Sequence, residues 1–160
     1  MEIRSLRVDE RCERKKNNYQ LSSAKRLSTY GAQELSIVNC QLSTNKMSTI
    51  QDKSRAFAIR MINCYRYLTE EKNEFVISKQ ILRSGTSIGA NTRESKNAQS
   101  RMDFLSKLNI ALKEADETEY WLDLLHATKY LDEKMYHSLN EDCTEIIKML
   151  TAIIKTLKEK

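Results

Sequence analysis

The sequence predicts an all-α fold, an antiparallel up-down-up-down four-helix bundle preceded by a disordered N-terminal extension. Three observations predict it. The 160 residues include no proline and three glycines, whereas a β-sandwich needs turn residues roughly every eight to twelve positions. The aromatic content of 7% is also low for such a sandwich. From Lys53 onward, apolar residues recur every three or four positions, which is the period of amphipathic helices.

The N-terminal segment, residues 1–46, shows neither a sustained helical period nor an alternating one. It is rich in Ser, Asn, Gln and charge, so it lacks the apolar surface that would offset the entropy cost of ordering it. We therefore expect residues 1–46 to be disordered or poorly ordered, and residues 47–160 to form the bundle domain. One hypothesis is that the functional chain begins at Met47.

Two helices are expected before residue 98. The first begins near Lys53 and ends near Leu68, and its apolar face repeats in steps of four, four and three through Phe57, Met61, Tyr65 and Leu68. The second covers about 75–97 and places small and polar residues among its inward positions, which are Ile77, Ile81, Ser84, Ile88 and Asn91.

Two further helices follow in the same spacing. Ser100 and Asp103 stand just ahead of an apolar run and resemble a capping box, which predicts a helix start there. The inward positions of this third helix are Phe104, Leu108, Ala111, Ala115, Thr118, Leu122 and Leu125. After a break at 130–133, the fourth helix continues the pattern through Leu139, Cys143, Ile146, Leu150, Ile153 and Leu157.

The stretch 83–91 holds two of the three glycines, Gly85 and Gly89, inside the second predicted helix. A phosphate-binding loop is excluded because no lysine follows Gly89, the Walker spacing is absent and no strand precedes the stretch. Two glycines one turn apart, with small neighbours, instead favour close packing against another helix or a bend. We expect close helix packing at both glycines.

Glu114 and Glu117 form an acidic pair one turn apart on the third helix. Such a pair can bind a divalent metal, as in all-helical nucleotide pyrophosphohydrolases, but a second acidic pair is needed. Glu141 with Glu145, four apart, and Asp142 with Glu145, three apart, are the candidates. An antiparallel hairpin that turns near 98–99 instead places Arg83 level with Glu114, so that the arginine and the acids pair. We favour this structural role.

The histidines and the tryptophan form no pattern that predicts a catalytic, metal or cofactor site. The two histidines, His126 and His137, lie in no Glu-x-x-His arrangement, so the ligands of a di-iron bundle are missing. Trp121 is interpreted as a helix-packing anchor.

The cysteines and the hydropathy indicate a cytoplasmic protein. The four cysteines include no CxxC pair, so we expect reduced thiols, with Cys64 and Cys143 in the core. No stretch approaches the roughly 18 consecutive apolar residues of a membrane span, and 1–46 has no secretory-signal core.

Two segments resemble a known family. They are Ser84-Gly-Thr-Ser-Ile-Gly-Ala-Asn91, followed by Glu94 and by Phe104-Leu105, and Ala111-Leu-Lys-Glu-Ala-Asp-Glu-Thr-Glu-Tyr-Trp-Leu122. Both resemble the four-helix-bundle family of the 23S rRNA intervening sequence proteins, which is similar in turn to the accessory variability determinant of diversity-generating retroelements. The resemblance covers about 50–159. It implies a bacterial protomer that assembles into a ring-like pentamer and has no established enzymatic reaction.

The resemblance also implies partners and a set of matching positions. In the retroelement relatives, a reverse transcriptase and nucleic acid bind a strongly basic barrel. This chain departs from that subgroup, because the excess of positive charge lies mostly in 1–46 and residues 47–160 carry 18 Lys or Arg against 17 Asp or Glu. Few phosphates can then be neutralised without local clustering of cations. The positions that match the family are expected to form an inter-helix polar network: Arg83, Asn91, Glu94, Glu114, Glu117 and Trp121.

Several functions follow as hypotheses. The leading one is a non-enzymatic homo-oligomeric module that acts as an RNA- or ribonucleoprotein-associated adaptor. A protein-binding scaffold and a reverse-transcriptase accessory protein are alternatives, and a metal-dependent nucleotide hydrolase using Glu114 and Glu117 is a third. Self-association is suggested by apolar residues offset from the main seams, which are Ile110, Leu124, Ile147 and Ile154.

Overall fold

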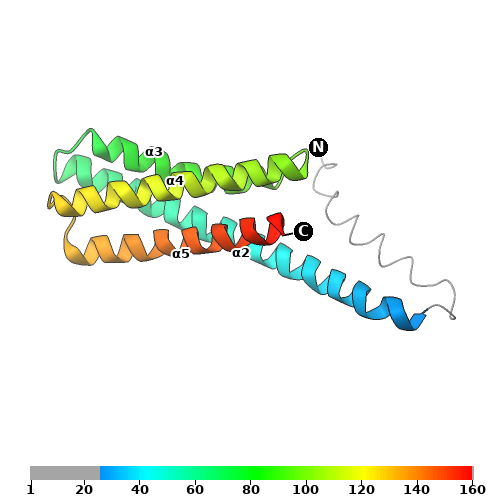
Figure 1. The fold of residues 1–160 in the computed structure, drawn as a ribbon. Coiled ribbons are helices and arrows are strands. Elements are labelled where there is room, and N and C mark those ends of the chain that lie inside the picture. Colours follow the sequence, from blue (N-terminus) through cyan, green and yellow to red (C-terminus); the bar gives the residue numbers. More distant parts are fainter. Residues whose placement is uncertain (1–25, 160) are drawn as a thin grey trace. The chain divides into compact units, whose positions relative to one another are not determined.

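The structure, a computed structural model, describes the backbone of residues 26–159 and the side chains of residues 47 and 49–159. The described part contains four helices and no strand (Figure 1). They are α2 (Arg26–Glu70), α3 (Ile77–Ser95), α4 (Arg101–Ala127) and α5 (Glu133–Lys158). The all-α prediction with four helices is confirmed.

The chain divides into two compact units, Met1–Met47 and Ser48–Lys160. Residues 1–25 of the expected disordered extension lie outside the described residues. Residues 26–46 lie in α2, which therefore begins well before the expected start near Lys53. A helix adds one backbone hydrogen bond for each residue fixed once a turn exists, and this stretch contains no proline to stop it.

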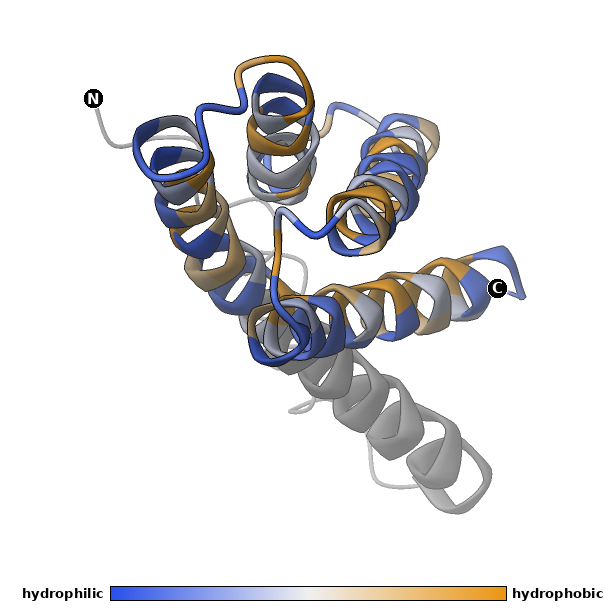
Figure 2. Ribbon diagram, turned by 90° about the vertical axis from the view of Figure 1, so that its left-hand side faces the viewer, coloured by the Kyte–Doolittle hydropathy of each residue, from blue (hydrophilic) through white to orange (hydrophobic). Residues whose placement is uncertain are grey.

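The core of residues 48–160 is built from the predicted apolar faces. In α2, Phe57, Met61 and Leu68 are at most 1% exposed. Hydrophobic and hydrophilic residues alternate along each ribbon of this unit, as expected for helices with one buried face (Figure 2). The predicted positions of α4 and α5 that are buried are Leu108, Ala111, Ala115, Thr118, Leu122, Leu125, Leu139, Cys143, Ile146 and Leu150.

The predicted seams of α3 and α5 are displaced by one residue near their C-terminal ends. Thr92 is fully buried where Asn91 was expected, and Ile154, at 5% exposure, takes the place expected for Ile153. A strict 3.5-residue spacing drifts around a straight helix of 3.6 residues per turn. After two or three turns a step of four therefore replaces the expected step of three. The proposed outward role of Ile154 is wrong for the same reason.

Contacts between neighbouring helices of this unit pair late residues of one with early residues of the next. Ser84 and Glu94 of α3 contact Thr118 and Lys107 of α4, respectively, so these two helices are antiparallel. Cys143 of α5 contacts the Ala115 carbonyl oxygen, while Tyr136 reaches Asp123. The same reversal therefore relates α4 and α5, which lie side by side in Figure 1.

Side-chain caps fix where three helices begin. The predicted start at Ser100 is confirmed, since its hydroxyl accepts a bond from the Asp103 backbone N–H at 3.1 Å. Asp132 caps α5 by accepting from the Met135 N–H at 2.7 Å. Glu74 accepts bonds from the backbone N–H groups of residues 76, 77 and 78 ahead of α3. Each cap satisfies donors that have no partner inside the helix.

Both cysteines of the second unit are buried thiols without a disulfide. Burial raises the pKa of Cys64 to about 11 and that of Cys143 to about 12. Such thiols remain protonated and poorly reactive near neutral pH. No described helix combines the length and apolar character that crossing a membrane requires.

Candidate nucleic-acid interface

Gly85 and Gly89 of α3 both lie against α2. A β-carbon added at Gly85 would lie 2.3 Å from Cγ of Met61, which is fully buried. At Gly89 an added β-carbon would lie 3.4 Å from the Ser54 carbonyl oxygen, an ordinary van der Waals contact. The structure therefore places both glycines against α2, and only Gly85 lacks room for a methyl group.

Two buried hydroxyl pairs connect α3 to its neighbours. Ser54 Oγ of α2 lies 2.9 Å from Thr92 Oγ1, and Thr118 Oγ1 of α4 lies 2.9 Å from Ser84 Oγ. All four side chains are fully buried. Sequence reasoning placed Ser84 and Thr118 inward but missed Ser54 and Thr92, because a small hydroxyl residue does not mark a helical face as strongly as an apolar one.

Arg83 does not form the expected ion pair with Glu114. The α3–α4 contacts at Ser84–Thr118 and Glu94–Lys107 displace the register from the expected one by about one helical turn. Helical side chains lean toward their own N-terminus, so α3 side chains lean away from the connecting loop and α4 side chains lean toward it. Each α3 residue therefore meets a partner further along α4 than its axial level indicates. This lean was omitted from the sequence-based register. Arg83 is exposed and acts on Glu114 only at longer range.

The other predicted network residues make mostly local contacts. Asn91 Nδ2 donates to the Ser87 carbonyl oxygen, and Trp121 Nε1 donates to Glu117 Oε1 at 3.1 Å, in each case within one helix. Glu94 pairs with Lys107 of α4 at 2.7 Å. Of these four residues, Glu94 is therefore the one whose side-chain bond crosses between helices.

Glu114 carries an oxygen that the fold does not satisfy. Its Oε2 atom is buried and has no hydrogen-bond partner among the residues that the structure describes. Burial and the nearby Glu117 raise the pKa of Glu114, while Arg83 opposes that shift. Burial and Glu119 likewise raise the pKa of Asp116. Glu114 and Asp116 therefore take up a proton more readily than an ordinary Glu or Asp side chain does.

Replacing Glu114 with glutamine is expected to stabilise the protein at pH 7, by up to about 1 kcal/mol, because the buried position no longer holds an unpaired charge. A raised folded-state pKa means that wild-type stability falls as pH rises through that pKa. The gain should therefore shrink at pH 4 in urea unfolding. Glu94→Gln, which removes an exposed ion pair, should instead be neutral or slightly destabilising. A loss of stability in Glu114→Gln at pH 7 would contradict the assignment.

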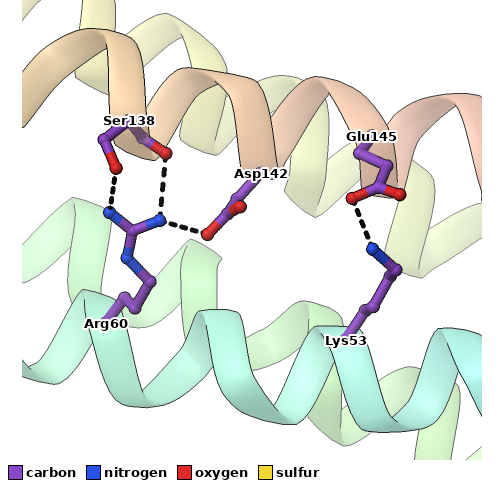
Figure 3. Close-up of polar contacts among 5 residues, drawn as sticks. All are labelled: Lys53, Arg60, Ser138, Asp142 and Glu145. Carbon is purple, nitrogen blue, oxygen red and sulfur yellow. Dashed lines mark hydrogen bonds and ion pairs between the residues drawn. The ribbon is translucent and has the colours of Figure 1, made fainter.

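The second acidic pair faces a different helix. Figure 3 shows Asp142 and Glu145 of α5 directed toward Arg60 and Lys53 of α2. Lys53 Nζ lies 2.5 Å from Glu145 Oε2, and Arg60 also binds Ser138. These carboxylates are not brought together with Glu114. In the part of the chain with described side chains, no group of three His, Cys, Asp or Glu is placed to hold a metal ion.

The outward face of α3 carries exposed cations that the sequence analysis did not single out as a group. Lys79, Arg83 and Arg93 fall within about 80° of the helix circumference and span about 21 Å. Lys96 follows at the helix end, and all four residues are exposed. None of the four takes part in an ion pair with a described residue. We call these four residues the α3 cation face. A helical projection of 79–96 could have found it.

Comparison with known proteins decides the family. The family model described as 23S rRNA-intervening sequence protein matches residues 46–152. The chain belongs to this family. A crystal structure of a protein of unknown function from the S23 ribosomal protein family of Bacteroides thetaiotaomicron is 61% identical, with a TM-score of 0.68. The match covers 69% of this chain and 98% of that one. Comparison with curated proteins found no match.

The match to the 23S rRNA-intervening sequence protein family includes the whole α3 cation face and the α3–α4 seam. It also includes every residue that the sequence analysis singled out for the polar network. The family resemblance carried by residues 84–91 and 111–122 is thus confirmed, and these segments form the two sides of one helix pair.

Proposed function

We propose that this 23S rRNA-intervening sequence protein is a non-enzymatic, self-associating helical module that binds RNA or a ribonucleoprotein through the α3 cation face. The observation that carries the proposal is the exposure of these four cations along α3 and at its end, none of which forms an ion pair with a described residue. The acidic residue of α3, Glu94, is paired with Lys107, so it does not neutralise the face. Cations in such an arrangement are free to replace counterions on a phosphate backbone.

The local clustering supports the proposal despite the small net charge of residues 47–160. Binding to phosphates depends on the cations that face the nucleic acid, not on the charge of the whole domain. Acidic side chains are concentrated elsewhere, at Glu114–Asp123 of α4 and at Asp142 and Glu145 of α5. Because positively and negatively charged side chains lie in different places, a domain with almost no net charge has a basic face.

Self-association is supported by apolar side chains that remain exposed in the protomer. Ile59 and Ile62 of α2, which are neighbours on one helix face, are 45% and 38% exposed, and Ile110 of α4 is 38% exposed. A second copy covering these residues would remove apolar surface from water. The expected number of five copies comes from the family resemblance. The same exposed residues favour the alternative function, a protein-binding scaffold.

Binding of the full chain to structured 23S rRNA fragments tests the RNA proposal. Fluorescence anisotropy across a salt series should give a linear fall of log affinity with log salt concentration. The test variant replaces three residues of the α3 cation face with glutamine: Lys79, Arg83 and Arg93. We expect weaker binding and a salt slope reduced by between about 2 and 3, since each lost phosphate contact removes about 0.7 to 0.9 from it.

A variant with the same change of charge provides the control. It replaces three exposed lysines of α5 with glutamine: Lys148, Lys155 and Lys158. This control should retain the wild-type slope. Equal effects of the two variants, or wild-type affinity no tighter than the nonspecific range of roughly 10⁻⁴ to 10⁻⁶ M, would reject the α3 cation face as an RNA site. Retention of one protein partner after nuclease treatment would then favour the scaffold.

A further inference from the structure

A cavity lies where the connection from α2 to α3 approaches the connection from α4 to α5. Its volume is about 600 Å³, which is within the range of small-molecule sites. It is lined at one side by Tyr67 and Lys72 and at the other by residues of the α4–α5 turn, including His126, Lys129, Leu131 and Glu133. None of these residues belongs to the α3 cation face.

The carboxylates at this cavity already have partners. Asp132 accepts the Met135 N–H at the start of α5. Glu133 lies between the two histidines of the chain, with Oε2 at 2.7 Å from His126 Nε2 and Oε1 at 2.9 Å from His137 Nε2. The two acids are therefore occupied by contacts within the turn itself.

The ammonium groups of Lys72 and Lys129 are different, because neither forms an ion pair with a described residue. Lys72 Nζ lies 5.6 Å from the centre of the Tyr67 ring, a cation–π contact that holds the Lys72 side chain at the cavity. Lys129 has a left-handed backbone with φ of 63°, and its N–H donates to the His126 carbonyl oxygen. Two cations without an ion-pair partner among the described residues thus stand at one cavity, beside two carboxylates that already accept hydrogen bonds.

The cavity also offers surface for the organic part of a ligand. Leu131 is 2% exposed and closes part of the wall with an apolar side chain. Tyr67 and His126 also line the cavity. The His126 ring is stacked on Tyr136 at a centroid distance of 4.2 Å, and aromatic rings accommodate nucleobases regardless of sequence. A ligand that combines a phosphoryl group with a flat ring matches these features together.

We propose that this cavity binds a nucleotide unit, with the Lys72 and Lys129 ammonium groups contacting its phosphoryl oxygens and the Tyr67 side of the cavity contacting its ring. The proposal deepens the proposed RNA function by adding a second site for the same ligand class, and it rests on that function where the nucleotide is the end of an RNA. A free nucleotide presents the same chemistry.

NMR titration of the full chain with adenosine 5′-monophosphate, adenosine and inorganic phosphate tests the proposal. We expect saturable amide shifts at the cavity residues, at least about tenfold tighter for the nucleotide than for adenosine, because adenosine lacks the charged group. Lys72→Gln and Lys129→Gln should each weaken nucleotide binding at least about fivefold. The glutamine variant of Lys79, Arg83 and Arg93 should bind the nucleotide as the wild type does.

The source of the nucleotide is distinguished with a short RNA that carries either a 5′-phosphate or a 5′-hydroxyl. Tighter binding of the phosphorylated RNA, abolished by Lys129→Gln, identifies an RNA end, whereas equal binding of both RNAs together with tight mononucleotide binding identifies a free nucleotide. Equal affinity for the nucleotide and adenosine, or unchanged binding in both lysine variants, would overturn the proposal. Failure of the α3 cation face alone leaves the mononucleotide result intact, so the two proposals fail separately.

Discussion

Replacing Gly85 with alanine is expected to lower the free energy of unfolding by about 1 kcal/mol. The new methyl group would lie 2.3 Å from Met61 Cγ and 3.0 Å from its Cβ. These atoms are close to the α2 backbone, and Met61 is fully buried, so rotation of a side-chain end cannot relieve the clash. Overpacking of about 1–3 kcal/mol therefore exceeds the gain of about 1 kcal/mol that alanine brings to a helix interior.

Gly89→Ala is the matched control for that substitution. Its β-carbon would make ordinary contacts with Ser54 and Ala58, so the helix gain should dominate and stabilise the protein by about 0.5–1 kcal/mol. Urea unfolding monitored by circular dichroism measures both variants. Adding Met61→Ala to Gly85→Ala should cost less than the sum of the two single changes, because the methyl group then occupies vacated space. Equal stabilities of Gly85→Ala and Gly89→Ala would contradict the close approach of α3 to α2.

The second large effect is expected at Glu74. This side chain is 7% exposed and accepts the N–H groups of residues 76, 77 and 78 at 2.6–3.0 Å. Val76, the residue at the N-cap of α3, makes no side-chain capping bond, so the first turn depends on Glu74. Glu74→Ala should lower the free energy of unfolding by about 2 kcal/mol, since it leaves these donors without their acceptor.

The contribution of Glu74 should also depend on pH. Burial raises its pKa, but the hydrogen bonds from residues 77, 78 and 76 outweigh burial and hold the pKa of Glu74 below its usual value. The stabilisation is therefore complete above the unfolded-state pKa and is lost as pH falls through the lower, folded-state pKa. Urea unfolding should show a smaller difference between wild type and Glu74→Gln at pH 3 than at pH 7. A difference that grows toward acid pH would contradict this assignment.

The helices and most of the core could be predicted because the spacing of apolar side chains shows which face of each helix is buried. Positions such as Leu108, Leu122 and Leu150 can be buried only on one side of a helix, and three or four of them in register define that side. The Ser100 cap has an equally local signal. Family membership followed from two segments that later proved to be the facing sides of α3 and α4. These features depend on residues within a few turns of one another.

The candidate site could be predicted less well because it depends on register between helices. The expected Arg83–Glu114 pair required an axial match that residue spacing alone does not define, and the lean of helical side chains moved it by about one turn. Ion pairs of Lys53 and Arg60 with α5 join residues more than 75 positions apart in the sequence. The α3 cation face could have been predicted from residue spacing, but the near-zero net charge of 47–160 does not reveal a local cluster of cations.

The hydroxyl pairs at Ser54–Thr92 and Ser84–Thr118 have a further consequence for how α3 is positioned. Apart from Ile81 and Ile88, the buried residues of α3 are glycine, serine and threonine, whose small side chains offer little steric resistance to sliding. Movement of α3 by one turn would place Ser84 opposite Leu122 or Glu114 and separate both pairs, leaving polar atoms stranded away from water. The two hydroxyl pairs therefore fix α3 at one axial position relative to α2 and α4.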